Sequence, residues 1–437
     1  MVSGIKIAIL TQYRCMSSSS TSSQAGPADG GDQPLRRHTP FKLFWCASVA
    51  STIALQMQIV AVGWQIYQLT HSAFDLGIVG LVQFIPSLIL VFVVGHVADK
   101  HDRRNVARIS ALVEALAAAA LALGSIGGWL NREIIFAIVF VIGAGRAFSK
   151  PTMSAMLPSL MPPALLPRAV AGSASATQFA IIIGPAVGGF LYVAGPVVVY
   201  ASSCVLFALC SLLLTLIKRP PQAAPATGTK PTGASLSSVF AGLAFIRSKP
   251  AIFGAISLDM FAVLLGGATA LLPVYAHDIL QTGSAGLGLL RSAPAVGALA
   301  VALILARNPL RGRVGRTMFV AVGVFGLATI VFGLSRSFAV SLLALVVLGA
   351  SDMISVVVRS SFVQLETPDE MRGRVSAVNS VFIGTSNQLG EFESGLTAAW
   401  FGAVPAVLIG GIGTIFIVLL WIRLFPALYQ VDRLRSN

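Results

Sequence analysis

The sequence Gly-His-Val-Ala-Asp-Lys-His-Asp-Arg-Arg, at positions 95–104, is a short polar break between two long apolar runs. The run before it covers about residues 74–98, and the run after it about residues 105–128. Each run is long enough to cross the roughly 30 Å hydrocarbon core of a bilayer as a helix, which takes about 20 residues. The break therefore predicts a basic turn that joins two membrane-spanning helices.

The alternation of apolar runs and short breaks extends in both directions from this turn. Gly and Pro mark several breaks, as in Gly127-Gly128 and Gly195-Pro196, and these residues punctuate helices. The predicted spanning helices are twelve, at about 43–68, 74–98, 105–128, 133–157, 168–193, 197–217, 250–274, 284–306, 314–334, 338–362, 374–402 and 404–426. We therefore expect an all-α polytopic membrane protein.

Composition supports the same class. Charged residues make up 11% of the 437 residues and the mean hydropathy is +0.84, whereas soluble domains carry about 25% charged residues. These values exclude a soluble enzyme, a disordered chain and a disulfide scaffold. The net charge of +14 is typical of basic cytoplasmic loops, so no nucleic acid partner is expected. The four cysteines form no C-x-x-C pattern, and neither a metal nor a cofactor is expected.

Lys and Arg are distributed unevenly over the predicted loops. With the N-terminus inside the cell, the inner loops hold sixteen of them and the outer loops only Arg132 and Arg336. Because cytoplasmic loops carry the excess of basic residues, both termini are predicted to be cytoplasmic.

The two halves of the apolar region repeat each other. An offset of 206 residues pairs Gly184 with Gly390 and Gly189 with Gly395, and an offset of 208 pairs Gly80 with Gly288 and Pro86 with Pro294. Six crossings return the chain to the same side of the membrane, so the halves are parallel repeats. The predicted fold is therefore twelve transmembrane helices in two pseudo-symmetric six-helix bundles.

The chain divides into five predicted segments. They are a disordered cytoplasmic tail at 1–40, an N-terminal bundle at 41–217, a cytoplasmic linker at 218–249, a C-terminal bundle at 250–426 and a cytoplasmic tail at 427–437. The linker begins Lys-Arg-Pro-Pro, and its second part has the apolar spacing of an amphipathic helix that lies on the membrane. Translation starts at Met1 or at Met16.

The turn at 95–104 resembles motif A of the major facilitator superfamily, G-x-x-x-D-R/K-x-G-R-R/K. The matching residues are Gly95, Asp99, Lys100, Arg103 and Arg104, while Asp102 replaces the usual Gly. An acid and a basic cluster at a helix end can form an ion-pair network that switches at a cytoplasmic gate. The alternative is an ordinary basic loop.

A second stretch, in the fifth predicted helix, resembles the end of that superfamily's antiporter motif, G-P-x-x-G-G. The matching residues are Gly184, Pro185, Gly188 and Gly189; the glycine expected four residues earlier is Ala180. Glycines permit close packing and Pro permits bending, so a plain packing surface is the alternative.

Two more stretches, 63–70 and 364–375, resemble the bacterial branch that holds the enterobactin exporter and macrolide-efflux-like proteins. The resemblance covers about residues 41–426. It implies secondary active export by alternating access.

Charged residues inside predicted spans are the candidate site residues, because charge in a bilayer is costly and is usually functional. The acids are Glu114, Asp259, Asp352, Glu391 and Glu393, and the bases are Arg146, Lys150, Arg291 and Arg359. This mixture shows no preference for the charge of a substrate. Aromatic residues at span ends, such as Tyr67, are interpreted as interfacial anchors.

Arg146 and Asp352 occupy equivalent positions of the two halves, near the middle of their helices. The sequence predicts that they face each other across a central cavity and couple protons to substrate; a structural ion pair is the alternative. Glu391, Glu393 and Asp259 are further candidates for a proton site, against polar packing positions. Glu391 and Glu393 are two residues apart, so only one of them is expected to face the cavity.

The predicted function is a secondary active transporter that exports small amphipathic molecules of drug, antibiotic or siderophore type, coupled to proton antiport. It would act as a monomer in the bacterial inner membrane, with the lipid bilayer, a small-molecule substrate and protons as its partners. No ATP-binding G-x-x-x-x-G-K-S/T and no H-E-x-x-H is found, so no enzyme is predicted. An importer on the same fold, and a membrane-embedded enzyme or receptor, are the alternatives.

Overall fold

The computed structural model describes residues 38–90, 93–94, 97, 100–217, 236–308, 310 and 312–431. Within these residues the protein is helical and contains no strand. The first half contains α2 (Thr39–Thr70), α3 (Ala73–Ile89), α5 (Arg103–Gly127), α6 (Arg132–Leu160), α7 (Leu166–Tyr192) and α8 (Pro196–Leu216). The second half contains α9 (Leu236–Ser248), α10 (Pro250–Leu265), α11 (Leu272–Val274), α12 (Gly283–Arg307), α13 (Val314–Leu334), α14 (Phe338–Leu365), α15 (Asp369–Phe401), α16 (Ala403–Leu424) and α17 (Pro426–Tyr429).

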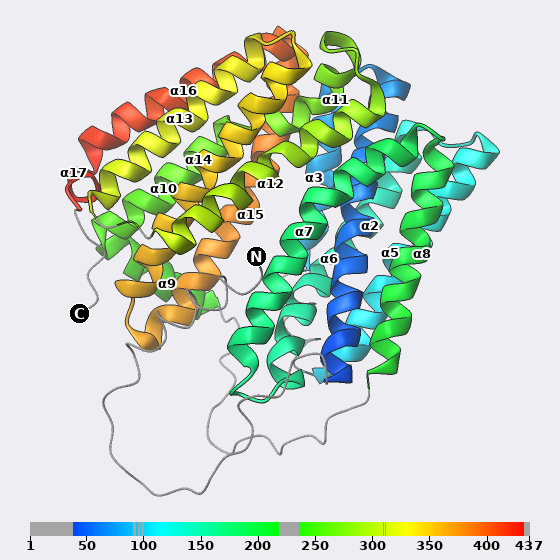
Figure 1. The fold of residues 1–437 in the computed structure, drawn as a ribbon, viewed down its shortest axis with the longest axis horizontal. Helices are drawn as coiled ribbons and strands as arrows, with labels where there is room; N and C mark the ends of the chain where they lie inside the picture. Colours follow the sequence, from blue (N-terminus) through cyan, green and yellow to red (C-terminus); the bar gives the residue numbers. More distant parts are fainter. Residues whose placement is uncertain are drawn as a thin grey trace, which may run out of the picture.

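The helices form two bundles that stand side by side, α2 to α8 in one and α10 to α16 in the other (Figure 1). This arrangement confirms the predicted fold class. The predicted tails and the linker fall largely outside the described residues. The part of the linker that is described forms α9, which packs on α15. The contact is close: a Cβ at Gly242 would lie 2.9 Å from the Arg374 carbonyl oxygen.

Local chemistry explains where the helices begin and end. The side chains of Ser72, Asp102 and Asn131 each accept a hydrogen bond from a backbone N–H in the first turn of the following helix. Such caps satisfy donors that a helix start leaves free. Gly128 follows α5 with a φ of 68°, a conformation that glycine adopts without strain.

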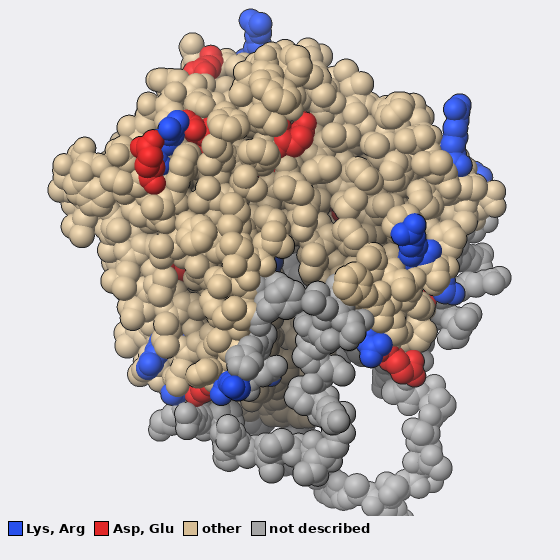
Figure 2. All heavy atoms as spheres, turned by 180° about the vertical axis from the view of Figure 1, so that it is seen from behind, with Lys and Arg blue, Asp and Glu red and all other residues tan. Residues whose placement is uncertain are grey.

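Ten of the described helical segments are long and apolar enough to span a membrane. Two of the twelve predicted spans are weaker by this measure. The described part of α3 has only 17 residues, and α15 is interrupted by Asn387, Gln388, Glu391 and Glu393. Large apolar side chains such as Leu116 and Phe416 are exposed on the bundles, and Figure 2 shows a mostly uncharged surface. Such a surface is suited to lipid.

The seventh spanning segment differs from the single helix predicted at 250–274. The helix α10 stops at Leu265, and the chain then passes through Gly266-Gly267, a 3₁₀ turn (Ala268–Leu271), α11 and a π turn (Tyr275–Ile279). A side chain at Gly267 would collide with the backbone of Gly390 on α15. Two glycines weaken the helix there and allow α15 to approach closely.

The bundles contact each other mainly at one end, which we call the closed end. Two glycine pairs mark these contacts. A Cβ at Gly77 of α3 would lie 3.1 Å from the Gly395 Cα of α15, and a Cβ at Gly288 of α12 would lie 3.0 Å from the Gly189 Cα of α7. At the other end, the open end, where α6 ends and α15 begins, the bundles diverge (Figure 1), and the surface between them is hollowed (Figure 2).

The described residues of the motif at 95–104 lie at the open end. Gly95 and Asp99 are outside the described residues, and Lys100 is exposed. The Arg103 Nη1 donates to the Ala155 carbonyl oxygen of α6 at 3.2 Å, and the Arg104 Nη1 donates to the Ile217 carbonyl oxygen after α8 at 2.6 Å. These two bonds tie the start of α5 to the ends of its neighbours.

The glycines of the antiporter-like motif form packing surfaces in the structure. A Cβ at Gly184 would lie 2.6 Å from the Gln56 Cβ, and one at Gly188 would lie 2.7 Å from the Met57 Cα, both on α2. Gly189 and the Pro185 carbonyl contact Gly288 of α12. The motif therefore holds α7 closely against its own bundle and against the other one.

Candidate functional site: the central cavity

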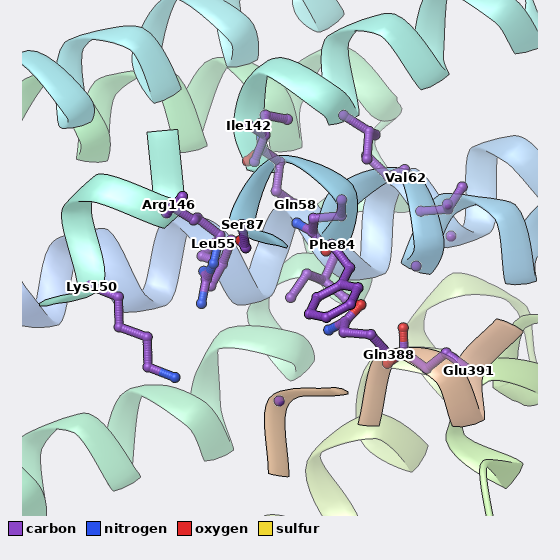
Figure 3. A pocket seen from close by; sticks show the side chains of 18 of the residues that line it. Leu55, Gln58, Val62, Phe84, Ser87, Ile142, Arg146, Lys150, Gln388 and Glu391 are labelled. Carbon is purple, nitrogen blue, oxygen red and sulfur yellow. The ribbon is translucent and has the colours of Figure 1, made fainter. Parts of the chain in front are cut away.

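A cavity of about 720 Å³ lies between the two bundles and extends toward the open end. This volume suits a drug-sized molecule. Its walls come from α2, α3 and α6 on one side and from α11, α12 and α15 on the other. The polar and aromatic lining residues are Gln58, Gln83, Phe84, Ser87, Arg146, Lys150, Ser154, Arg291, Ser380, Gln388 and Glu391, and several are seen in Figure 3.

The N-terminal wall carries two positive charges on α6. Arg146 and Lys150 are four residues apart, and both reach into the cavity (Figure 3). Behind them, the buried Glu114 of α5 packs against Gly145, where a Cβ would lie 3.1 Å from the Glu114 Cγ. The charges of Glu114 and Arg146 act on each other. Glu114 thus compensates Arg146 from inside the bundle and leaves the guanidinium on the cavity wall.

The C-terminal wall carries one acid, Glu391, at the contact between the bundles. A Cβ at Gly80 of α3 would lie 2.6 Å from the Glu391 Oε2. The charge of Arg291 on α12 acts on Glu391, and both residues line the cavity. Glu391 is therefore placed where a change of its charge affects both its own bundle and the α3 contact.

Glu393 does not line the cavity. It accepts a hydrogen bond of 2.8 Å from the Thr397 Oγ1 of its own helix. Two residues along a helix correspond to a rotation of about 200°. The two acids accordingly face different sides, as expected from their spacing.

Three glutamines, Gln58, Gln83 and Gln388, also line the cavity, and none of them was singled out from the sequence. The Gln58 side chain is 2% exposed, and within the described residues neither its amide nitrogen nor its amide oxygen has a hydrogen-bond partner. The Gln388 Oε1 on the opposite wall is also buried without a hydrogen-bond partner among the described residues. The only sequence signal was a glutamine in an apolar run, which carries no recognisable spacing.

Asp259 and Asp352 lie in a different place, inside the C-terminal bundle. Asp259 of α10 forms a buried ion pair with Arg359 of α14 and accepts a hydrogen bond of 2.9 Å from the Ser355 Oγ. Asp352 lines a small internal pocket together with Asp259, and the charges of both acids and of Arg359 act on one another. Arg359 therefore compensates two acids that the central cavity does not include.

The predicted facing pair of Arg146 and Asp352 is wrong for this structure. Arg146 lines the central cavity, whereas Asp352 lines the internal pocket of the other bundle. The physical reason is that each side chain has an opposite charge within its own bundle, Glu114 for Arg146 and Arg359 for Asp352. The attraction between opposite charges within one bundle is stronger than the attraction across an open cavity, because electrostatic attraction falls with distance and with solvation.

A polar contact joins the bundles at the closed end. Tyr67, interpreted from the sequence as an interfacial anchor, is instead buried, and its hydroxyl donates to the Asp278 carboxylate of the C-terminal bundle. His277 Nδ1 lies 2.6 Å from the other Asp278 oxygen, and the His71 and His277 rings are 5.6 Å apart. The sequence carries no signal for this cluster because His71, His277 and Asp278 lie near span ends, where polar residues are ordinary.

Comparisons with known proteins agree with this architecture. A family model described as a transmembrane secretion effector matches residues 30–436. The enterobactin exporter EntS of Citrobacter koseri is 26% identical over 406 residues, which cover 90% of this chain and 94% of the relative. EntS of Escherichia coli O81 is 25% identical over 414 residues, which cover 92% and 95% of the two chains.

Solved structures share the fold. One is a mutant of the nucleoside transporter NupG, with a TM-score of 0.70 at 15% identity over 88% of this chain and 100% of that one. Another is a bacterial homologue of the iron transporter ferroportin in an inward-facing state, with a TM-score of 0.69 at 15% identity over 91% and 100%. The resemblance to the major facilitator superfamily and to enterobactin exporters is confirmed. The chain belongs to the transmembrane secretion effector family of that superfamily, and it is a multi-pass membrane transporter rather than an enzyme.

Proposed function

We propose that the protein exports small amphipathic molecules of drug, antibiotic or siderophore type by alternating access, in exchange for protons. The observation that carries this proposal is a drug-sized cavity between two bundles that is open at one end and closed at the other. Export is favoured over import because the relatives that align over most of the chain are named enterobactin exporters. The excess of Lys and Arg in the predicted inner loops supports a cytoplasmic location of the open end and of both termini in a bacterial cell.

The closed end is built so that it can separate. Its contacts include the two glycine crossings, the hydrogen bond of Tyr67 to Asp278 and the ring contact of His71 with His277. These groups lie on different bundles, so a rocking motion that separates them exposes the cavity to the other side of the membrane. Asp99 and the Arg103/Arg104 pair of the motif at 95–104 are expected to close the cytoplasmic gate after this motion.

Glu391 is the proton site that the geometry favours. It lines the cavity, packs on Gly80 of the other bundle and has Arg291 as its charge partner. A proton on Glu391 removes its attraction for Arg291 and makes the carboxyl group less costly to move through an apolar contact. Asp259 is less suited to this role because its carboxylate already forms an ion pair with Arg359 and accepts a hydrogen bond from Ser355 inside one bundle.

The test is transport in proteoliposomes with an imposed proton gradient. Substrate movement should require the gradient, and Glu391→Gln should retain substrate exchange but lose gradient-driven accumulation. Glu393→Gln is the matched control, since it changes the same group two residues away and outside the cavity. Accumulation by wild-type protein without any ion gradient contradicts secondary transport, and gradient-driven accumulation by Glu391→Gln removes Glu391 as the proton site.

The direction and the substrate class need a cellular measurement. A deletion strain should become more sensitive to exported antibiotics or dyes, or should retain a siderophore that the parent secretes. Inside-out membrane vesicles should accumulate the same compound, whereas right-side-out vesicles should not. Uptake by right-side-out vesicles supports the importer instead.

A further inference from the structure

We propose that Arg146, Lys150 and Gln58 form an anion-binding subsite in the cavity, so that the transported molecule carries a carboxylate, sulfonate or similarly charged group joined to an aromatic or apolar body. This inference rests on the proposed function in that it takes the central cavity as the substrate site. It assigns a charge to the substrate, which the sequence left open.

The fold sorts the charged residues of the spans unequally. Among the described residues, the lining of the cavity includes three bases, Arg146, Lys150 and Arg291, but only one acid, Glu391. The other acids are directed elsewhere: Glu114 packs behind α6, Asp259 and Asp352 lie in the internal pocket, and Glu393 bonds to Thr397. A balanced set of charges in the sequence thus becomes a cavity whose described lining has more bases than acids.

The positive charge is concentrated on α6. Within the described residues, neither the Arg146 guanidinium nor the Lys150 amine makes a hydrogen bond or a direct ion pair. The charge that acts on Lys150 is that of Arg146, which has the same sign. Like charges one helical turn apart repel each other. An anion between them would replace this repulsion with two attractions, and a bidentate contact with the guanidinium is available to a carboxylate or a sulfonate.

The Gln58 amide also supports an anion-binding subsite. It is buried on the cavity wall with both its polar atoms unpartnered in the described structure, and a buried amide without a partner costs free energy. Phe84, Val62 and Ile142 provide apolar surface on the same side of the cavity (Figure 3). Donors and apolar surface together match a charged head group on an apolar body.

A cationic substrate fits this cavity less well. Glu391, the one acid among the described lining residues, already has Arg291 as its partner. A cation would therefore have to displace Arg291 while two further positive charges remained on α6. This contrast gives the probe pair for the test, namely an anion and a cation built on the same ring system.

The experiment measures equilibrium binding by fluorescence anisotropy, with the purified full chain in lipid nanodiscs. The probes are carboxyfluorescein, an anion, and rhodamine 123, a cation with the same xanthene body. Wild-type protein should bind carboxyfluorescein at least tenfold more tightly than rhodamine 123. The variant Arg146→Gln/Lys150→Gln should lose at least tenfold in affinity for carboxyfluorescein. Arg336→Gln/Arg423→Gln, which removes the same charge from two exposed positions, should bind as the wild type does.

Several results overturn the proposal. They are equal affinity of the wild type for the two probes, no saturable binding of carboxyfluorescein, and an unchanged affinity in the Arg146/Lys150 variant. If the double variant fails to fold, Lys150→Gln alone tests the subsite, because Lys150 is an exposed side chain. It should lose at least threefold in affinity, and no loss counts against the subsite.

Transport of carboxyfluorescein in proteoliposomes separates this inference from the proposed function. Saturable binding without gradient-driven transport of any tested compound argues against the transporter mechanism and leaves the subsite in place. Gradient-driven transport that does not change in the Arg146/Lys150 variant leaves the mechanism in place and removes the subsite.

Discussion

Positions 146 and 352 are equivalent in the internal repeat, on α6 of one bundle and on α14 of the other. Arg146 lines the central cavity beside Lys150, with Glu114 behind it. Asp352 lines the internal pocket of its bundle beside Asp259, and Arg359 compensates both acids. The same place in the same helix arrangement therefore carries a charge that lines the central cavity in one half and a charge that lines an internal pocket of the bundle in the other.

The difference shows which features the two halves of the repeat share and which features differ between them. Duplication preserves helix order and the glycines that set helix crossings, because these determine whether the bundles pack. The role of a charge depends on which partner the neighbouring helices provide. The C-terminal bundle provides a closed ion-pair network, and the N-terminal bundle leaves two basic groups on the cavity wall.

The largest expected effect comes from breaking the enclosed network. Arg359→Leu leaves Asp259 and Asp352 without a counter-charge in an apolar interior, and loss of one partner of a buried ion pair costs about 3–5 kcal/mol. The folded yield and the thermal unfolding temperature in detergent should both fall strongly. Arg423→Leu, at an exposed arginine of α16, is the control and should unfold as the wild type does. A stable Arg359→Leu protein contradicts the structural role of the network.

The charge on the cavity wall, Arg146, should behave differently. Arg146→Gln should reduce transport at least tenfold and should also lower stability, because Glu114 is then uncompensated. The double variant Arg146→Gln/Glu114→Gln should recover thermal stability but not transport. Recovery of transport in the double variant would mean that Arg146 acts only as a structural partner. The measurements are the unfolding temperature and the initial rate of transport.

The glycine crossings at the closed end offer a third test. A side chain at Gly288 would meet the Pro185 carbonyl oxygen at 2.5 Å. Gly288→Val should therefore hold the closed end apart and reduce transport about tenfold. Gly323→Val on α13 is the matched control, since nothing lies within 4 Å of its Cβ position. The distance between spin labels at 132 and 336, one in each bundle at this end, should increase only in the Gly288 variant.

The smallest expected effect concerns the hydrogen bond across the closed end. Tyr67→Phe removes the donor to Asp278, and a hydrogen bond contributes about 1 kcal/mol, which corresponds to roughly a fivefold shift between states. The population open at this end, read from the same spin-label distance, should rise accordingly. Tyr192→Phe removes a hydroxyl that bonds Gln68 inside one bundle, so it should leave the population unchanged. Equal shifts in both variants would show that the bond does not hold the bundles together.

The amino-acid sequence by itself determined the helical class, the number of spans, the parallel repeat and the family, because these follow from run length, loop charge and motifs. It also identified Arg146, Glu391 and Asp259 as costly charges. Glu391 does line the cavity, whereas the Arg146–Asp352 pair does not form. Helix rotation cannot be predicted from runs that are apolar on every side.

Only the tertiary structure decided which polar groups share a space. Gln58, Gln388, the Tyr67–Asp278 bond and the break of the seventh segment all depend on helices that are distant in the chain. Their signals are single residues without characteristic spacing. The environment of a side chain in a bundle is set by the helices packed around it, and that packing is a property of the whole chain rather than of any one segment.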